Sequence, residues 1–338
     1  MNGTRVFAAA VVWCLAAASA LSQQAAPARQ QAQAPAAPRS RVAATDMKAT
    51  AIPGVVAAGA TVQVIKRDFE VAINGPIGLP DGSGVLVAEI LRNRVWKFDN
   101  NNQGSVFVDN SSGALCLAFD AKGRLIANQT MPAERNTIAV IYPRGQEAVL
   151  ADNFDGMAFG RPNDLVINRS GGIYFTDPGP NQGQMKIGHP KTDPAVFYIP
   201  PGGKAMKVAV DVPDPNGLVL SPDEKTLYVA DTSGEFVYAY EVGAGGQLGT
   251  RRNFARLQEG GEAEADGMAI DDDGRLYVSV WGGVEVFDAQ GRRLGLISGS
   301  GPGNLAFGGP DRKTLYITGG TSLSKVALLA QGPKARAK

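Results

Sequence analysis

The sequence predicts an all-β fold, a six-bladed β-propeller built from four-stranded antiparallel blades. Three observations support this prediction. First, the 338-residue chain contains 42 glycines and 21 prolines, which supply turns between many short strands, and 44% hydrophobic residues, which supply a large core. Second, one strand-turn-strand pattern recurs six times at spacings of about 40 to 50 residues, the length of a propeller blade. Third, the last copy has one strand too few, and a spare strand lies near the N-terminus.

The first twenty residues resemble a secretory signal peptide. They contain one arginine, then an uncharged apolar run, then the small residues Ala18, Ser19 and Ala20, which suit a signal peptidase. The apolar run of about fifteen residues is shorter than the roughly twenty that a membrane-spanning helix needs. We therefore expect cleavage after residue 20, export to the periplasm or the medium, and no membrane span in the mature chain.

Residues 21–58 are predicted to form a disordered linker. The stretch "SQQAAPARQQAQAPAAPRS" is rich in alanine, glutamine and proline and shows no apolar periodicity. The propeller is then expected over residues 59–330, and residues 331–338 are expected to form a basic tail.

The six repeats share one form, a polar or small residue followed by a short apolar strand, a Gly/Asp/Pro turn and a β-branched or aromatic strand. The third copy, for example, reads "NDLVINRSGGIYFTDP". Two further strand-like runs follow most copies, such as "FVYAYEV" and "RRNFARL", which gives four strands per blade. The run from Thr61 to Arg67 is expected to complete the last blade and close the ring, which disfavours a β-sandwich or an open solenoid. The copies begin at Asn74, Leu115, Asn163, Asn216, Asp266 and Asn304.

These six starting positions are expected to converge. In a propeller the first strand of each blade lines the central channel, so the residues before these strands meet at its mouth. Five of the six carry a side-chain oxygen, too many for an apolar core. Amide oxygens with one carboxylate suit calcium, whereas zinc and copper favour thiolate or imidazole ligands. Asp266, the one carboxylate, is expected to ligate the ion or to activate water.

Turn formation is the alternative explanation for these residues, because asparagine and aspartate side chains bond to nearby backbone. Turn formation does not require the same register in five blades, however, and the shared register favours a metal site.

Charge and cysteine content exclude several classes of function. The 33 lysines and arginines nearly balance the 32 aspartates and glutamates, so no global field favours nucleic acid or an anionic membrane. Cys14 lies in the signal peptide, which leaves Cys116 alone in the mature chain and permits no disulfide. The single histidine, His189, lies in a Gly/Pro-rich insertion. Cys116 is therefore predicted to be a buried apolar thiol and not a nucleophile.

Four stretches carry a resemblance to a known family over nearly all of residues 61 to 328. They are "RPNDLVINRSGGIYFTDP", "PNGLVLSPDEKTLYVADT", "ADGMAIDDDGRLYVSVWGGVEVFD" and "NLAFGGPDRKTLYIT". Together they resemble the gluconolactonase family, the senescence-marker-protein or regucalcin-like group of six-bladed propellers. The resemblance implies a divalent cation on the axis, most often calcium, and hydrolysis of sugar or other lactones. We accordingly expect a monomeric hydrolase of small lactones or esters.

The resemblance also assigns roles to individual residues. It implies that Asn163, Asn216 and Asp266 ligate the metal, and that Asp266 is also the catalytic base. Arg161 and Asn163 match positions that hold substrate. The alternative for Arg161 is a surface arginine paired with a local carboxylate.

Two departures from the family pattern bear on function. Asn74 stands where relatives usually have a metal-ligating glutamate; its amide oxygen can still coordinate, but with one negative charge fewer. Leu115 and Cys116 replace a frequent Asn-Gly pair, which indicates a less polar substrate. A propeller that binds a small ligand or a protein without catalysis, or one that hydrolyses phosphotriesters or other esters at the same site, is the alternative function.

Overall fold

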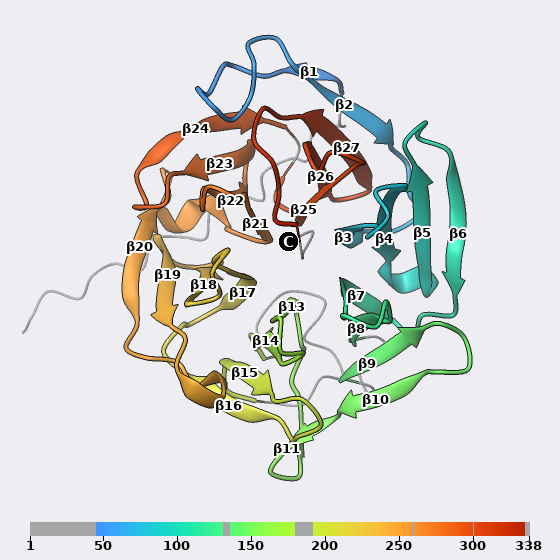
Figure 1. The fold of residues 1–338 in the computed structure, drawn as a ribbon, viewed down its shortest axis with the longest axis vertical. Coiled ribbons are helices and arrows are strands. Elements are labelled where there is room, and N and C mark those ends of the chain that lie inside the picture. The colour runs from blue at the N-terminus through green and yellow to red at the C-terminus, as the bar shows by residue number, and fades with distance from the viewer. Residues whose placement is uncertain (1–44, 131–135, 180–191, 259, 300, 335–338) are drawn as a thin grey trace, which may run out of the picture. The chain divides into compact units, whose positions relative to one another are not determined.

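A computed structural model describes residues 45–130, 136–179, 192–258, 260–299 and 301–334. Within these residues, six antiparallel sheets are arranged around a common axis, which confirms the predicted six-bladed β-propeller (Figure 1). The predicted signal peptide, residues 21–44 of the predicted linker, and His189 lie outside the described residues. No helix in the described part of the chain is long and apolar enough to span a membrane.

Blades 1 to 5 each contain four strands, in the order in which the repeats occur. Blade 1 contains β3 (Ile73–Gly78), β4 (Gly84–Glu89), β5 (Arg94–Asp99) and β6 (Gly104–Asp109). Blade 2 contains β7 (Ala114–Phe119), β8 (Leu125–Gln129), β9 (Thr137–Tyr142) and β10 (Ala148–Ala151). Blade 3 contains β13 (Leu165–Ile167), β14 (Ile173–Asp177), β15 (Ala195–Ile199) and β16 (Met206–Ala209). Blade 4 contains β17 (Pro215–Leu220), β18 (Thr226–Asp231), β19 (Phe236–Glu241) and β20 (Arg252–Arg256). Blade 5 contains β21 (Met268–Ile270), β22 (Leu276–Val280), β23 (Gly283–Phe287) and β24 (Arg293–Ser298).

The connections contain a few short elements. A small hairpin, β11 (Asn153–Phe154) and β12 (Met157–Ala158), joins blades 2 and 3. The described 3-10 helices are η1 (Ile90–Arg92), η3 (Ala244–Gly246) and η4 (Gly260–Ala263).

Blade 6 closes the ring with a strand from the N-terminal side, as the repeats predicted. It contains β25 (Leu305–Gly308), β26 (Thr314–Gly319) and β27 (Ser322–Ala327), and β2 (Thr61–Lys66) pairs antiparallel with β27. A short fifth strand, β1 (Met47–Lys48), pairs with β2. The two ends of the propeller chain are thus hydrogen-bonded to each other in one sheet (Figure 1).

The predicted linker is wrong over residues 45–58, which pack on the propeller. Ile52, Val55 and Val56 are buried in an apolar cluster with side chains of blades 5 and 6. The Cβ of a residue at Gly295 would lie 2.9 Å from Ile52, so β24 passes close to this segment. The segment was missed because its few apolar residues are not periodic, and only the neighbouring blades reveal the surface that they cover.

The predicted tail likewise begins too early at residue 331. Gly332 donates its N–H to the carbonyl of Arg312 at 2.8 Å, and the carbonyl of Gln331 accepts the N–H of Asp272 at 2.8 Å. Pro333 is buried. Residues 331–334 therefore belong to the packed propeller, and residues 335–338 lie outside the described part.

Aspartates fix the turns between the strands of a blade. Asp120 accepts the backbone N–H groups of Lys122 and Arg124, both at 2.9 Å. Asp271 does the same for Asp273 and Arg275 at 3.0 and 2.8 Å. Because such side-chain caps need only local sequence, these hairpins were visible in the repeat pattern.

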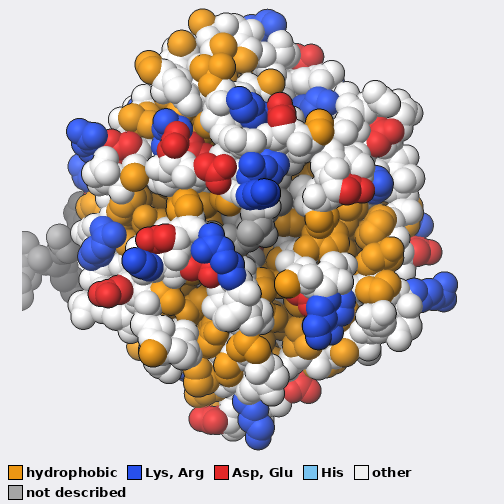
Figure 2. All heavy atoms as spheres, in the orientation of Figure 1, with side chains coloured by type: hydrophobic (Ala, Val, Ile, Leu, Met, Phe, Trp, Pro, Cys, Tyr) orange, Lys and Arg blue, Asp and Glu red, His pale blue; other side chains and the backbone are white. Residues whose placement is uncertain are grey.

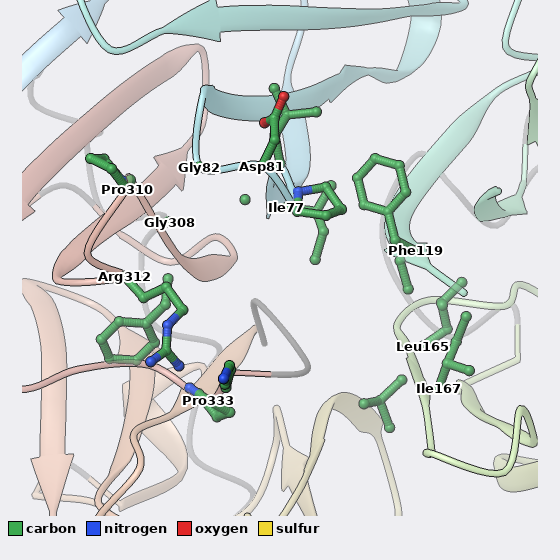
Figure 3. A pocket seen from close by; sticks show the side chains of 18 residues that line it. Ile77, Asp81, Gly82, Phe119, Leu165, Ile167, Gly308, Pro310, Arg312 and Pro333 are labelled. Carbon is green, nitrogen blue, oxygen red and sulfur yellow. The ribbon is translucent and has the colours of Figure 1, made fainter. Parts of the chain in front are cut away.

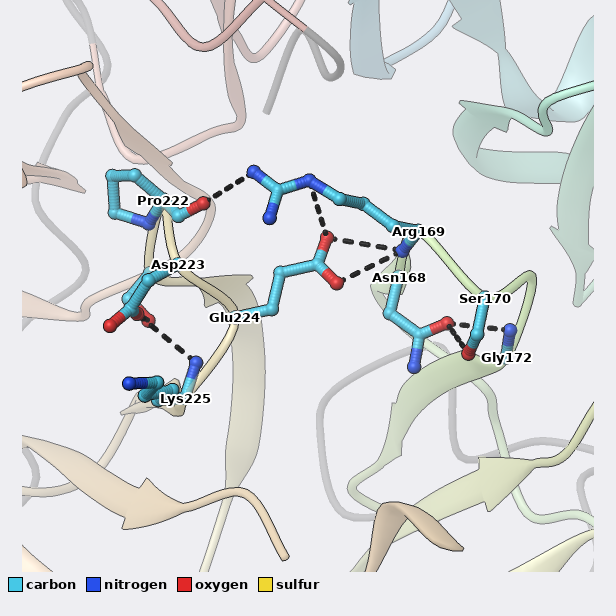
Figure 4. Close-up of polar contacts among 9 residues, drawn as sticks. Asn168, Arg169, Ser170, Gly172, Pro222, Asp223, Glu224 and Lys225 are labelled. Atoms are coloured by element: carbon cyan, nitrogen blue, oxygen red, sulfur yellow. Dashed lines mark hydrogen bonds and ion pairs between the residues drawn. The ribbon is translucent and has the colours of Figure 1, made fainter. Parts of the chain in front are cut away.

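The core lies between neighbouring sheets. Six larger apolar clusters each join two consecutive blades, and the sixth joins blade 6 to blade 1. Polar contacts between turns add to this packing (Figure 4). In the turn after β13, the backbone N–H of Arg169 donates to Glu224 of blade 4 at 3.0 Å, and its guanidinium donates to the carbonyl of Pro222 at 2.6 Å.

The surface shows no field of one sign. On the face in Figure 2, lysine and arginine side chains are interspersed with aspartates and glutamates. This distribution agrees with the balanced composition and offers no basic stripe for a polyanion.

Candidate functional site

The candidate residues lie at one end of the first strands, where three blades carry the same irregularity. The pairing of first and second strands shifts between Asn74 and Ile77 in blade 1, between Ala114 and Leu117 in blade 2, and between Pro215 and Leu218 in blade 4. A bulge bends a strand and re-aims its side chains. We call this end of the channel the mouth.

Glycines that follow the candidate residues allow neighbouring blades to approach closely. Gly75 has a φ of +52°, and a Cβ there would lie 2.5 Å from the Cα of Cys116. A Cβ at Gly217 would lie 2.3 Å from the carbonyl oxygen of Asp266. The Asn-Gly and Asp-Gly pairs of the repeats are therefore required by contacts between blades, as well as by local turns.

Contacts across the mouth bring blades 1, 2 and 6 together. The Cys116 thiol lies 3.1 Å from Asn304 Nδ2 and 3.7 Å from Asn74 Oδ1. Asn128 accepts the Cys116 backbone N–H at 2.6 Å and donates its amide to the carbonyl of Asn163 in blade 3. Cys116 is 1% exposed, which confirms the predicted buried thiol.

A second chain of hydrogen bonds joins blades 3, 4 and 5. The backbone N–H of Asn163 donates to Thr176 O at 2.8 Å, and Thr176 Oγ1 donates to Asn216 O at 2.7 Å. Asn216 Nδ2 donates to Thr232 Oγ1 at 2.8 Å, and Thr232 Oγ1 donates to the carbonyl of Ala265, next to Asp266, at 2.9 Å. These bonds link the backbone at or next to Asn163, Asn216 and Asp266 across three consecutive blades.

Arg161 is buried and surrounded by carboxylates. Its side chain belongs to a residue that is only 8% exposed, so the surface-arginine alternative is wrong. Burial lowers the pKa of Arg161, and the charges of Asp214, Asp177 and Asp266 oppose that shift. Arg161 Nε is buried and has no hydrogen-bond partner among the described residues. An unpartnered buried donor costs about 1 to 3 kcal/mol, so this group is suited to a ligand that can accept its hydrogen bond.

The carboxylates around Arg161 were found only in part from the sequence. Asp266 begins a repeat and Asp177 ends the strand sequence "YFTD", whereas Asp214 carries no motif and was missed. Burial raises the pKa of Asp177, and backbone hydrogen bonds from Arg161, Gly179 and Gly160 oppose the shift. Asp214 precedes Asn216 by two residues, just as Arg161 precedes Asn163 in blade 3, and this spacing is the signal that would have identified it.

The predicted metal ligands fit a hard cation to different degrees. Asn216 Oδ1 is buried and has no hydrogen-bond partner among the described residues, so this oxygen is available as a ligand. Asn74 Oδ1 instead accepts the N–H of Gly75 at 2.6 Å. Asn304 Oδ1 accepts the N–H of Leu305 at 2.8 Å. Of the predicted ligands, Asn216 therefore has an oxygen available for a cation, and Asn74 fits less well.

This oxygen set is poor in ionisable ligands. The described residues contain no group of three or more histidine, cysteine, aspartate or glutamate side chains arranged to hold a metal. A cation at the mouth would therefore depend on amide oxygens for most of its protein ligands, and those ligands suit calcium better than zinc.

Asp164 has a structural position. Its Oδ1 accepts the N–H of Leu165 at 2.8 Å and its Oδ2 accepts the N–H of Leu218 at 3.2 Å, so it ties blade 3 to blade 4. It is 0% exposed. Asn163 and Asp164 are thus adjacent in sequence but differ in role.

A cavity of about 350 Å³ lies at the opposite end of the first strands (Figure 3). Its wall contains Ile77, Phe119 and Ile167 from the far ends of β3, β7 and β13, together with Arg312 and Pro333. None of the candidate site residues lines it. The predicted site residues therefore lie at the mouth and not in this cavity.

Comparisons with known proteins identify the family of this chain. Residues 73–321 match the family model described as the SMP-30/Gluconolactonase/LRE-like region. A gluconolactonase of Zymomonas mobilis is 30% identical over 78% of this chain and 80% of its own length. A 6-deoxy-6-sulfogluconolactonase of Pseudomonas putida is 29% identical over 73% of this chain and 82% of its own length. A solved gluconolactonase structure from Xanthomonas campestris superposes with a TM-score of 0.73 at 28% identity, covering 86% of this chain and 97% of that one. The chain therefore belongs to the SMP-30/gluconolactonase/LRE-like family.

Proposed function

We propose that this protein is an exported lactone hydrolase that depends on a divalent cation, most favourably calcium, and acts on gluconolactone or a related lactone. The observation that carries this proposal is the buried, unpartnered Asn216 Oδ1, whose side chain is linked through Thr232 to the carbonyl of Ala265, next to Asp266. The names of the relatives, gluconolactonase and other sugar lactonases, support the reaction class.

The chain's own residues divide the work of hydrolysis. A divalent cation held by Asn216, Asp266 and Asn163 would polarise the lactone carbonyl as a Lewis acid. Asp266 accepts a proton from the water that attacks the carbonyl carbon. Arg161 donates its unpartnered Nε–H to a lactone oxygen and so orients the ring. The ring C–O bond then breaks, the leaving alkoxide takes the proton held by Asp266, and the product is the open hydroxy acid.

The deciding experiment is a lactone panel with and without a chelator. Wild-type protein is expected to hydrolyse a sugar lactone, to lose activity with EDTA and to regain it with calcium. Asp266→Asn should abolish turnover while the protein stays folded. Activity that persists in Asp266→Asn, or is indifferent to the chelator, would refute this mechanism.

Binding without catalysis is the second candidate, and the position of Asn74 favours it. Its amide oxygen is occupied by the N–H of Gly75, so a cation has one oxygen fewer than in relatives with glutamate there. Calorimetry with calcium separates the two candidates. No heat of binding at millimolar calcium rules out the hydrolase mechanism, and binding without turnover on any lactone leaves a ligand-binding propeller.

Export is the part of the proposal that rests on residues 1–20 alone. N-terminal sequencing of the protein recovered from the periplasm or medium should give a chain that starts near residue 21. Recovery of the intact N-terminus from the cytoplasm would contradict it.

A further inference from the structure

Asp177, at the end of β14, binds the backbone that carries Arg161. Its Oδ1 accepts the N–H of Arg161 at 2.8 Å and that of Gly179 at 2.9 Å, while its Oδ2 accepts the N–H of Gly160 at 2.7 Å. The residue is 1% exposed. One carboxylate thus accepts the consecutive N–H groups of Gly160 and Arg161, one on each oxygen, and also the N–H of Gly179.

The surrounding chain leaves this segment little freedom to move. A Cβ at Gly160 would lie 2.0 Å from Thr192 Oγ1, 2.8 Å from Gly179 Cα and 3.0 Å from Asp177 Oδ1. The segment before Arg161 is therefore pressed against the carboxylate and cannot shift without losing its hydrogen bonds.

The next blade repeats part of this arrangement, with an aspartate at the position of Arg161 and Pro213, which has no N–H, at that of Gly160. Asp231 ends β18 as Asp177 ends β14, and its Oδ1 accepts the N–H of Asp214 at 3.2 Å. Asp214 precedes Asn216 by two residues, as Arg161 precedes Asn163. We call the contact between the carboxylate of Asp177 and the backbone N–H groups the clamp. Both blades have an aspartate at this strand end, but only in blade 3 does it hold the backbone of an arginine.

We propose that Asp177 is a positioning residue, which fixes Arg161 so that its unpartnered Nε–H meets the substrate at the mouth. This role rests on the proposed function, because it needs Arg161 to contact a lactone. Asp177 itself touches the backbone of Arg161 and acts through it. Its removal should lower substrate binding more than the rate of the chemical step, which Asp266 supports.

A double-mutant cycle on the full-length protein with gluconolactone tests this inference. Asp177→Asn is expected to raise KM roughly tenfold with kcat changed less than about threefold, as loss of a binding contact predicts. In an Arg161→Ala background, Asp177→Asn should change KM less than about twofold, because residues that act through one contact are not additive.

Asp271→Asn is the matched control. Asp271 is 0% exposed and also accepts the backbone N–H and the guanidinium of an arginine, Arg275, but at the turn end of blade 5. It should lower thermal stability comparably and leave KM unchanged. Equal KM changes in Asp177→Asn and Asp271→Asn, or additive effects of Asp177→Asn and Arg161→Ala, would overturn the positioning role.

Amide hydrogen exchange keeps the two proposals separable. Asp177→Asn should accelerate exchange at Gly160 and Arg161 at least tenfold, and Asp271→Asn should not, whether or not a lactone is turned over. Accelerated exchange without any lactone hydrolysis by the wild type would refute the proposed function but support the clamp. Unchanged exchange at both amides would refute the clamp even in an active enzyme.

Discussion

Asn216 offers the sharpest test of the cation site, because its two side-chain atoms have opposite energetic effects. Asn216 Nδ2 makes one hydrogen bond, to Thr232 Oγ1 at 2.8 Å, whereas Asn216 Oδ1 is buried without a partner in the described chain. Loss of the hydrogen bond costs about 1 kcal/mol, and removal of an unsatisfied buried oxygen recovers about 1 to 3 kcal/mol. In EDTA, Asn216→Ala should therefore be as stable as wild type within about 1 kcal/mol, or slightly more stable.

Asn304→Ala is the contrasting variant. Asn304 is 1% exposed, and both of its side-chain polar atoms are bonded, Oδ1 to the N–H of Leu305 and Nδ2 to Cys116 Sγ. Its truncation leaves a buried N–H without a partner and should cost about 2 to 3 kcal/mol. In thermal unfolding each kcal/mol corresponds to about 2 to 4 °C, so the two alanine variants are distinguishable in EDTA.

Calcium should stabilise wild type more than it stabilises Asn216→Ala. At a free concentration of about one hundred times Kd, calcium stabilises the folded protein by about 2.7 kcal/mol. A variant that binds tenfold more weakly gains only about 1.4 kcal/mol at the same concentration. Differential scanning fluorimetry of wild type and Asn216→Ala, with calcium and with EDTA, measures the stability of each protein without metal and its stabilisation by calcium. The interpretation fails if Asn216→Ala loses 2 kcal/mol or more in EDTA, or if calcium stabilises it as much as wild type.

Three further predictions concern the fold. Ile52→Ala should lower the free energy of unfolding by about 2 to 4 kcal/mol in urea titrations, because Ile52 is 2% exposed between blades 5 and 6; the exposed Val210→Ala is its control, and equal effects would contradict the packing of residues 45–58. Asp164→Ala should cost about 2 to 4 kcal/mol, since it leaves the N–H groups of Leu165 and Leu218 buried and unpartnered; a loss under 1 kcal/mol would show that water replaces the carboxylate. Alkaline solution should destabilise the protein, because burial raises the pKa of six tyrosines; the unfolded chain therefore loses protons above about pH 10 that the folded chain keeps, and stability falls as the pH rises through that range. Tyrosinate absorbance that rises before the circular dichroism changes would refute this. These tyrosines are Tyr174, Tyr228, Tyr238, Tyr240, Tyr277 and Tyr316.

Local sequence was sufficient for the blades. The hairpin turns, such as the one fixed by Asp271, depend on a few consecutive residues, and the six copies repeat them at blade spacing. The same register predicted that Asn163, Asn216 and Asp266 would converge, because the propeller maps equivalent positions onto one mouth. The missing strand of the last blade also predicted closure by residues 61–67, and the structure has β2 there.

Only the tertiary structure decided which side-chain oxygens at the mouth are already hydrogen-bonded and which are available to a ligand. Asn74, Asn216 and Asn304 look equivalent in the repeats, yet Asn74 and Asn304 bond to the next backbone N–H, while Asn216 keeps an unpartnered oxygen. Such differences depend on neighbours far apart in the chain, as Cys116 and Asn304 are, and no local pattern records them.

The same reason explains the misplaced boundaries and the surroundings of Arg161. Residues 45–58 lack periodicity because they cover a surface made by two blades. Asp214 and Arg161 lie in different blades, and only the closed ring brings their charges close enough to interact. The sequence by itself therefore determined the repeating unit and the residues at its mouth. Contacts between blades determined the partners of those residues, because burial and hydrogen bonding at the mouth are shared among blades that the chain reaches in turn.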